Sequence, residues 1–158
     1  MSSKKGQVVS YDFIISISFF FLILGFLLFY FYYYSSRTDD IREKNFMNDL
    51  AQRVSNIFFD EGNPIYWNEN NFLRIGLANN GKINNTKLEI LKNISYQKFL
   101  NSFKSGIFYI KLEIYNKSES LIYEYPNIGV SGKDIIKLER FFILNESFGK
   151  GVVYVFKK

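Results

Sequence analysis

The sequence predicts an α+β protein in which a long N-terminal hydrophobic helix precedes a small head of short helices and an antiparallel sheet. An uncharged apolar run extends from Phe13 to Tyr34, and apolar residues after it recur at helical spacing. In the last third of the chain, alternating apolar and polar residues predict strands. Helix first and antiparallel strands afterwards are typical of the α+β class, and 158 residues leave room for one modest head.

The composition limits the chemistry that the chain can perform. It contains no cysteine, which excludes disulfides, thiolate zinc sites and a cysteine nucleophile. It contains no histidine, the commonest general base and transition-metal ligand. Its acidic residues lack the spacing of a calcium loop, and residues 129–133 lack that of a phosphate-binding loop. We therefore expect no enzyme activity, no catalytic residue, no cofactor and no metal site.

The charge of the chain is basic but evenly spread. The formal net charge is +5. Many lysines alternate with Asn, Ile, Tyr and Phe along the whole chain instead of forming one block. This distribution is typical of a solvated basic surface, so no nucleic-acid partner is predicted.

The run from Phe13 to Tyr34 is long enough to cross a bilayer. At 1.5 Å per residue it would form a helix of roughly 33 Å. A secretory signal peptide has a shorter apolar core followed by a small-x-small cleavage site, whereas this run is longer and ends in aromatic residues. Tyrosines at the end of such a run are typical of a membrane interface, and here they are Tyr30, Tyr32, Tyr33 and Tyr34.

The charges on the two sides of the run predict its orientation. Lys4, Lys5 and the amino terminus precede it, while the charges between Arg37 and Lys44 cancel. We expect a single-pass protein of the cell membrane, in contact with lipid, with a cytoplasmic N-terminus and an external C-terminal domain. On hydropathy alone, the run is a plain signal anchor.

The residues directly before the run, KKGQ at positions 4–7, bear on its processing. A short basic leader that ends in Gly6 and is followed by Gln7 resembles the class III signal peptide of archaeal type IV pilins and related pseudopilin-like proteins. The resemblance implies that a prepilin peptidase cuts between Gly6 and Gln7 and leaves the hydrophobic helix on the protein. Glycine suits a tight protease subsite because it has no side chain, and Lys4 and Lys5 would hold the site at the inner membrane face.

An acidic residue lies close to the implied new N-terminus. Pilins of this kind carry a glutamate at the fifth mature position, which pairs with the amino terminus of a neighbouring subunit, but this position is Tyr11 here. The nearest acid is Asp12, which needs a cationic partner if it stays ionised at the membrane edge. The candidates are the amine of Gln7, in the same or a neighbouring subunit, or Lys4 or Lys5 in an uncut chain. Alternatively, Asp12 simply extends to the aqueous interface.

Helical periodicity continues beyond the membrane. Four apolar residues repeat at three and four positions, with charged residues on the other faces. We expect one helix over about 9–59, because Gly62 and Pro64 then interrupt it. The predicted divisions are a leader at 1–6, a transmembrane and assembly helix at 7–34, an amphipathic extension at 35–61 and an external head at 62–158. The repeating residues are Met47, Leu50, Val54 and Ile57.

The head is predicted to contain two short helices, a short strand and two hairpins. The first helix carries Leu88, Leu91 and Ile94 at helical spacing. The second begins after Ser95 as N-cap, reaches Phe103 and is ended by Gly106. The predicted strands are 72–77, followed by a turn at 79–81, then 107–115 and 120–125 around a loop at 116–119, and 135–144 and 152–156 across 145–151.

Three kinds of residue in the head are singled out. Glu113 and Glu124 fall on neighbouring predicted strands at surface positions, which are ordinary for glutamate. Trp67 is expected to be a structural packing anchor, and with Pro64 and residues 74–78 it resembles a region of archaeal pilin-like membrane proteins. Four Asn-x-Ser/Thr sequons are candidate glycosylation sites outside the membrane, namely Asn84, Asn93, Asn116 and Asn145.

Two functions fit these observations. The resemblance implies a type IV pilin-like subunit, a minor pilin or a pseudopilin, processed by a prepilin peptidase. Residues 14–31 would then assemble with other pilin-like subunits, or with further copies of the chain, in a cell-surface filament or a secretion-type complex. The alternative is an uncleaved single-pass membrane protein whose external domain binds a partner or a surface ligand. The two differ in the fate of residues 1–6 and in whether the aromatic residues of the helix contact lipid or other subunits.

Overall fold

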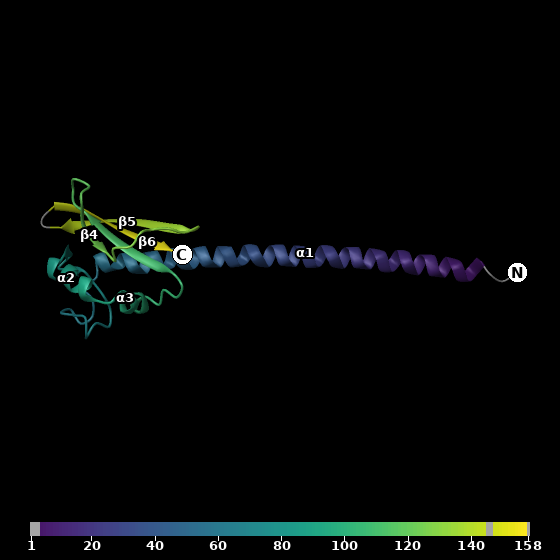
Figure 1. Ribbon diagram of the computed structural model, residues 1–158, viewed down its shortest axis with the longest axis horizontal. Helices are drawn as coiled ribbons and strands as arrows, with labels where there is room; N and C mark the ends of the chain where they lie inside the picture. Colours follow the sequence, from purple (N-terminus) through teal and green to yellow (C-terminus); the bar gives the residue numbers. More distant parts are fainter. Residues whose placement is uncertain (1–3, 145–146, 158) are drawn as a thin grey trace. The chain divides into compact units, whose positions relative to one another are not determined.

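The computed structural model describes residues 4–144 and 147–157, with side chains from Tyr11 onward. The chain divides into two compact units, one ending at Glu43 and the other beginning at Lys44. Figure 1 follows it from the long helix α1 (Lys4–Ser55) to the strands of the second unit. The predicted α+β class is confirmed.

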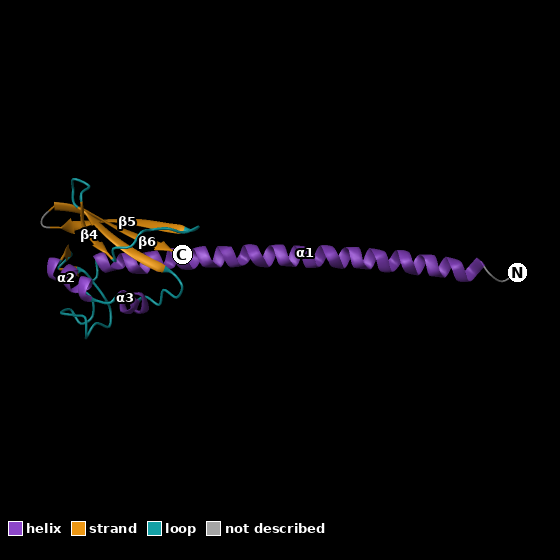
Figure 2. Cartoon of the chain, in the orientation of Figure 1, coloured by secondary structure: helices purple, strands orange, loops and turns teal. Residues whose placement is uncertain are grey.

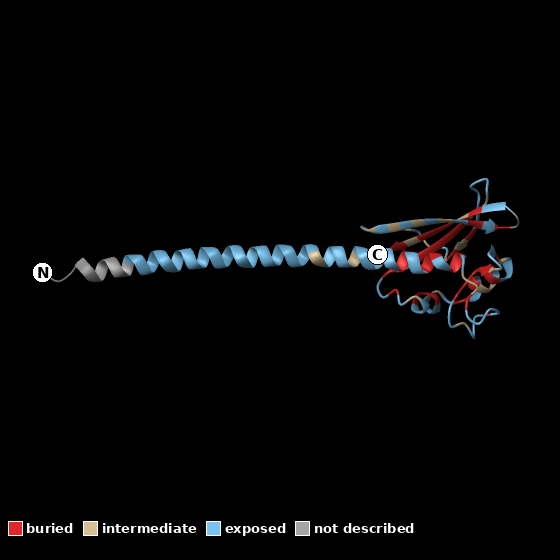
Figure 3. Ribbon diagram, turned by 180° about the vertical axis from the view of Figure 1, so that it is seen from behind, coloured by how far each residue is buried: buried red, intermediate tan, exposed pale blue. Residues whose placement is uncertain are grey.

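Helix α1 runs without interruption from Lys4 to Ser55, and the short 3-10 turn η1 (Asn56–Phe58) follows it directly. The single long helix expected over about 9–59 is therefore confirmed to within a few residues at each end. None of the described side chains from Tyr11 to Ile41 is buried (Figure 3). This part of the helix has no core of its own.

The second unit has one hydrophobic core, to which the end of α1 contributes a stripe of residues. Met47, Leu50 and Val54 lie three or four residues apart on one face of α1, and each is 0% exposed. In η1, the ring of Phe58 packs on Phe142, with ring centroids 5.2 Å apart. The amphipathic pattern of the sequence predicted this stripe, and the structure confirms that it is buried.

A mixed sheet, drawn in orange in Figure 2, supplies much of the rest of the core, and its strand order is β1-β2-β5-β6-β3-β4. Neighbouring strands are antiparallel except β2 and β5, which are parallel and meet at one pair, Lys82 and Ile143. Residues facing the core alternate along β3 and β6, as Ile110, Leu112 and Val153 show by being 0% exposed. The strands are β1 (Ala78–Asn79), β2 (Lys82–Ile83), β3 (Tyr109–Tyr115), β4 (Leu121–Tyr125), β5 (Ile135–Leu144) and β6 (Ser147–Phe156).

The strand predicted at 72–77 is wrong, and the reason lies in its hydrogen-bond partners. This segment bonds to the chain that follows α1, with Asn63 N donating to Arg74 O over 2.9 Å and Leu77 N donating to Ile57 O over 2.7 Å. Only Arg74 in it forms a bridge, and that bridge is isolated. The strand comes later, at β1. The predicted turn is confirmed, since Asn80 and Gly81 have φ of 50° and 73° between β1 and β2.

Two short helices lie between the β1–β2 hairpin and β3. In α2 (Asn85–Asn93), Leu88 and Leu91 face the core. Helix α3 (Tyr96–Ser102) begins after Ser95, whose hydroxyl accepts from Lys98 N as an N-cap, as predicted. It ends before Gly106, which lies in the turn after it.

The hairpin predicted between 107–115 and 120–125 is present as β3 and β4, and β5 has its predicted bounds. The last strand differs, because β6 begins at Ser147 rather than at residue 152. Gly149 and Gly151, which look like turn residues in the sequence, lie inside β6. A Cβ on Gly151 would come within 2.6 Å of the Phe58 ring and 2.7 Å of the Phe142 ring. These glycines therefore make room for core rings rather than for a turn.

A testable consequence concerns Gly76, where two backbone segments meet. A Cβ there would lie 2.2 Å from Gly62 N and 2.4 Å from Asp60 O, so a backbone segment has to move. We expect Gly76→Ala to lower the free energy of unfolding by about 3 kcal/mol. Urea unfolding of the full chain in detergent can be followed through the fluorescence of Trp67, the only tryptophan.

The matched control is Gly129→Ala, because a Cβ on Gly129 meets nothing within 4 Å. This variant should unfold at the urea concentration of the wild type. Equal midpoints for Gly76→Ala and Gly129→Ala would contradict the close backbone approach at Gly76.

Candidate functional site

The most conspicuous surface of the chain is the apolar part of α1. Between Tyr11 and Phe58 this helix contains an 18-residue window with a mean hydropathy of 2.6. Large side chains in it are open to solvent, for example Phe26 at 68% and Phe31 at 74% exposed. An exposed apolar surface of this extent requires lipid or protein around it. Helix α1 is long and apolar enough to cross a membrane.

Two hydroxyl groups of this helix, those of Ser18 and Thr38, are bonded within it. Ser18 Oγ donates to Ile14 O over 2.8 Å, and Thr38 Oγ1 donates to Tyr34 O over 2.8 Å. At the end of the apolar run, the rings of Tyr30 and Tyr34 stack with centroids 6.1 Å apart. Hydroxyls that bond to the preceding helical turn need no partner from lipid.

The candidate processing residues lie at the start of α1. Lys4, Lys5, Gly6 and Gln7 have helical backbone, and their side chains lie outside the described part of the structure. Asp12, the candidate charge partner, is exposed one to two helical turns later. Successive helix residues are about 100° apart, so Asp12 and Gln7 are about 140° apart around α1. The helix therefore places the two on different faces.

Three of the four sequons lie on the described surface of the head. Asn84 is the N-cap of α2, where its side chain accepts from the backbone N–H of Thr86 and Lys87. Asn116 closes the β3–β4 loop by accepting from Ser118 N and Ser120 N, each over 2.9 Å. In Asn84 and Asn116 alike, the side-chain carbonyl oxygen accepts these hydrogen bonds, whereas glycosylation takes place on the amide nitrogen. Asn93 is exposed at the end of α2, and Asn145 lies outside the described residues.

Trp67 lies in the core and ties the loop after α1 to the segment before β1. The indole is 2% exposed, and its Nε1 donates to Gly76 O over 2.8 Å. Its ring also packs edge-on against Phe72, with centroids 6.3 Å apart. A buried tryptophan with a bonded Nε1 acts as a packing anchor rather than as an open platform for a ligand.

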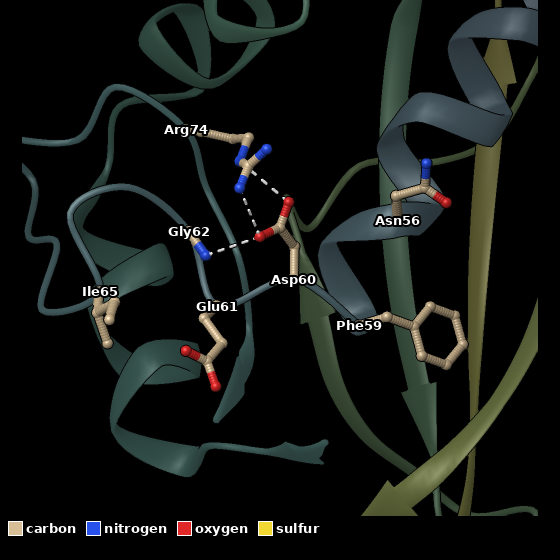
Figure 4. A pocket seen from close by; sticks show the side chains of 7 residues that line it. All are labelled: Asn56, Phe59, Asp60, Glu61, Gly62, Ile65 and Arg74. Carbon is tan, nitrogen blue, oxygen red and sulfur yellow. Dashed lines mark hydrogen bonds and ion pairs between the residues drawn. The ribbon is translucent and has the colours of Figure 1, made fainter. Parts of the chain in front are cut away.

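An open cleft of about 500 Å³ lies beside this loop (Figure 4). An ion pair crosses it, because Asp60 Oδ2 lies 3.0 Å from Arg74 Nε and Asp60 Oδ1 accepts from Arg74 Nη2 over 3.0 Å. Asp60 Oδ1 also accepts from Gly62 N. The cleft is lined by Asn56, Phe59, Asp60, Glu61, Gly62, Ile65 and Arg74.

The charged groups around the cleft hold the loop in place. Glu61 Oε1 accepts from Asn80 N over 2.9 Å, which fastens the loop to the β1–β2 turn. Behind it, the buried Lys87 donates to Glu61 O over 2.6 Å and to Ala78 O over 2.8 Å. Among the described residues, no group of three acidic side chains is arranged to hold a metal ion. The cleft is best explained as a by-product of loop packing.

A charge network that the sequence analysis missed lies on the sheet face opposite the core. Lys111 Nζ is 2.8 Å from Glu113 Oε1 and 3.1 Å from Glu124 Oε2. Tyr115 donates its hydroxyl to Glu113 Oε2 over 2.6 Å. The expectation that Glu113 is an ordinary surface glutamate is wrong, because it is only 8% exposed. The available signal was the alternation of Lys111, Glu113 and Tyr115 along one strand.

The network shifts the titration of its members. Burial raises the pKa of Glu113, but hydrogen bonds from Lys111 and Tyr115 and the charge of Lys111 outweigh it and hold the pKa below its ordinary value of 4.5. Burial lowers the pKa of Lys111, but hydrogen bonds to Glu113 and Glu124 outweigh it and raise the pKa above 10.5. Both groups are therefore charged near neutral pH.

The chain was compared with protein-family models, with curated proteins and with solved structures, and none of them matches it. Its function is therefore to be inferred from its own residues.

The buried charge network gives a second testable prediction. Lys111→Met leaves Glu113 buried without its cation, so we expect the free energy of unfolding at pH 7 to fall by about 3 kcal/mol. In the wild type, Glu113 stabilises the fold above the unfolded pKa of about 4.5, and this contribution is lost as pH falls through the lower folded pKa. The deficit of Lys111→Met should therefore shrink on acidification. Urea titrations at several pH values measure both effects.

The control is Lys137→Met on the same face, where β6 separates the two lysines. Lys137 pairs with Glu139 over 2.6 Å, but half of its side chain is exposed. Water screens an exposed pair, so this variant should cost little. If Lys111→Met were as stable as Lys137→Met at pH 7, the network would have no role in stability.

Proposed function

We propose that the chain is a type IV pilin-like subunit, either a minor pilin or a pseudopilin. A prepilin peptidase would remove residues 1–6, and the remaining helix would assemble into a cell-surface filament or a secretion-type complex. The observation that carries the proposal is the exposed apolar surface of α1 on a chain whose second unit has its own buried core. Such a chain can exchange the neighbours of its helix without unfolding its head.

The apolar surface of α1 supports an assembly role because it has two compatible environments. In water it would be unstable, since burial of apolar area contributes about 25 cal/mol per Å². Lipid covers it before assembly, and side chains of other subunits cover it afterwards. The aromatic residues at 19–34 give large contact areas in either case.

The basic leader supports processing on the cytoplasmic side. Lys4 and Lys5 precede Gly6, and a glycine before the cut gives the peptidase a residue without side-chain bulk. The orientation predicted from the flanking charges would put the head outside the cell, together with the sequons at Asn84, Asn93 and Asn116.

Asp12 supports contact between subunits. Because Asp12 and Gln7 lie about 140° apart around α1, the mature amine of one chain reaches the carboxylate of a neighbour more directly than its own. An ion pair between neighbours would remove two charges from the membrane edge at once. This pairing would set the stagger between adjacent helices.

The first test concerns processing. Gly6→Val should block cleavage, because a β-branched side chain does not fit a site built for glycine. Intact mass and N-terminal peptides of protein from membranes, prepared with and without an archaeal prepilin peptidase, give the result. The wild type should begin at Gln7 only when the peptidase is present.

Gly25→Val serves as the matched control, since Gly25 lies in the same helix and a Cβ there meets nothing within 4 Å. It should be cut like the wild type. A wild-type chain that keeps Met1 with active peptidase would support the alternative, an uncleaved single-pass protein whose head binds a partner.

The second test separates assembly from processing. Asp12→Asn should still be cut after Gly6 but should reach the sheared surface fraction at least about tenfold less, because the neighbour's amine loses its counter-charge. Quantitative mass spectrometry of the membrane and surface fractions measures this ratio. Asp39→Asn, beyond the apolar run, is the control and should not change it. Normal surface recovery of Asp12→Asn would exclude Asp12 as the charge partner.

A further inference from the structure

One edge of the sheet carries a long strand that is mostly unpaired. Strand β5 pairs with β6 along its whole length, from Ile135 to Leu144, without a shift in register. On its other side, among the described residues, only Ile143 pairs with a strand, namely with Lys82 of β2. Residues 135–142 therefore leave an outer backbone edge, called the open edge below.

The opposite edge of the sheet is much less suited to pairing. Strand β4 has five residues, from Leu121 to Tyr125, and the register of β3 and β4 shifts next to Tyr115. Pro126 follows it directly and has no N–H to donate. Short strands, irregular register and proline are the usual protections of a sheet edge. The open edge of β5 has none of these three.

The direction of its backbone groups follows from the β5–β6 hairpin. In an antiparallel strand, the N–H and C=O of one residue point to one side and those of the next residue to the other. Leu144 pairs with Ser147 across a two-residue connection, and the closing pair of such a hairpin exchanges its backbone hydrogen bonds, so Ile143 points its groups away from β6, on the side of β2. The residues at two-residue steps before it point the same way, and these are Phe141, Glu139, Lys137 and Ile135.

These four residues fit an identical strand in one antiparallel register. If Leu138 faces Leu138 of a second copy, all four outward residues are paired, Ile135 with Phe141 and Lys137 with Glu139. A shift by two residues in either direction places Lys137 opposite Lys137 or Glu139 opposite Glu139, and like charges directly opposite each other are destabilising. Only the first register satisfies the backbone and the charges together.

We propose that two copies of this chain pair through β5, antiparallel about a twofold axis at Leu138, to form one continuous sheet. The ladder would hold eight backbone hydrogen bonds at most, two for each of four hydrogen-bonded residue pairs. Each Lys137 would lie opposite Glu139 of the second copy, on both sides of the axis. This interface is isologous and closes on itself, so it yields a dimer and not an open chain of heads.

The partial burial of residues in β5 agrees with the lack of a neighbouring strand along its outer edge. Ile136 and Leu138 face the core and pack against it, yet both are only half-buried. On the other face, Ile135 is 44% and Phe141 67% exposed. In the proposed register Ile135 and Phe141 cover each other across the two copies. A second β5 would therefore cover apolar groups on both faces of the edge.

The pairing rests on the head alone and not on the proposed pilin-like function. A chain that is never cut after Gly6 could still form it. Cleavage and head pairing are measured separately, so failure of one leaves the other standing.

The test uses the absence of cysteine from the chain. In full-length Leu138→Cys the two thiols would face each other at a pair with a Cα–Cα distance of about 4.5 Å, which suits a disulfide. We expect mild oxidation in detergent to convert most of this variant to a covalent dimer. In Phe141→Cys the two thiols would be six residues apart along the ladder, about 20 Å. This more exposed cysteine should not form a dimer.

Charge variants in the Leu138→Cys background test the register without touching the core. Lys137→Glu places a glutamate opposite Glu139 of the partner on each side of the axis, so the cross-linked fraction at a fixed concentration should fall about tenfold. The double variant Lys137→Glu, Glu139→Lys exchanges the charges and should restore cross-linking. Far-ultraviolet circular dichroism and Trp67 fluorescence check that each head is folded.

Three outcomes would overturn the proposal. If the folded Leu138→Cys variant stays monomeric, a second copy does not occupy the open edge, and a strand of a different protein would be its occupant. Equal cross-linking of Phe141→Cys and Leu138→Cys would mean that the copies associate without this register, for example through α1. Cross-linking that ignores Lys137→Glu, or is not restored by the exchange, would exclude the charge pairing.

Discussion

The packing of the buried stripe of α1 against the sheet determines most of the fold of the second unit. Met47, Leu50 and Val54 exclude water from the inner sheet face, and strands β2 to β6 each place residues on the same core. Because that face is filled by the helix end and by rings such as Phe58, backbone at Gly149 and Gly151 has to lie close beneath them. Residues of low local strand preference are kept in β6 for this reason. A distant contact, not local preference, decides where the strand begins.

Filling one sheet face from the helix leaves the opposite face to be stabilised by its own side chains. Among the described elements, no helix covers this face, yet Lys111 and Glu113 on it are nearly buried. They are covered by neighbours of the same face, including Tyr115, which bonds to Glu113. Pairing is what allows charges to lie there, because an uncompensated charge would cost several kcal/mol. At the margin of the sheet, residues 135–142 of β5 pair only with β6, and Ile136 and Leu138 on the core face stay half-buried there.

The sequence predicts the features that local pattern controls. The long helix, the Ser95 cap, the Asn80–Gly81 turn and β5 all follow from spacing or from the φ preferences of single residues. The strand expected at 72–77 is absent because this segment bonds to the chain after α1, and the local sequence pattern does not specify which segments pair. Glu113 was misplaced for the same kind of reason, since its burial depends on β4 and β6. The candidate residues at positions 4–7 lie in a helix whose period is visible, but the processing proposed for them would depend on a protease and a membrane, which are separate molecules.

The hydrogen bonds of Ser18 and Thr38 bear on how α1 can pass from lipid to a protein environment. Ser18 and Thr38 bond to carbonyls one turn earlier in the same helix, so these bonds belong to the helix and not to its surroundings. When such a helix leaves one apolar solvent for another, none of these hydrogen bonds has to be broken or replaced. For these two side chains the transfer changes only dispersion contacts, which are individually weak and easily re-formed. These two hydroxyl groups therefore do not oppose an exchange of lipid for protein around the helix, although water remains an unfavourable environment for its apolar side chains.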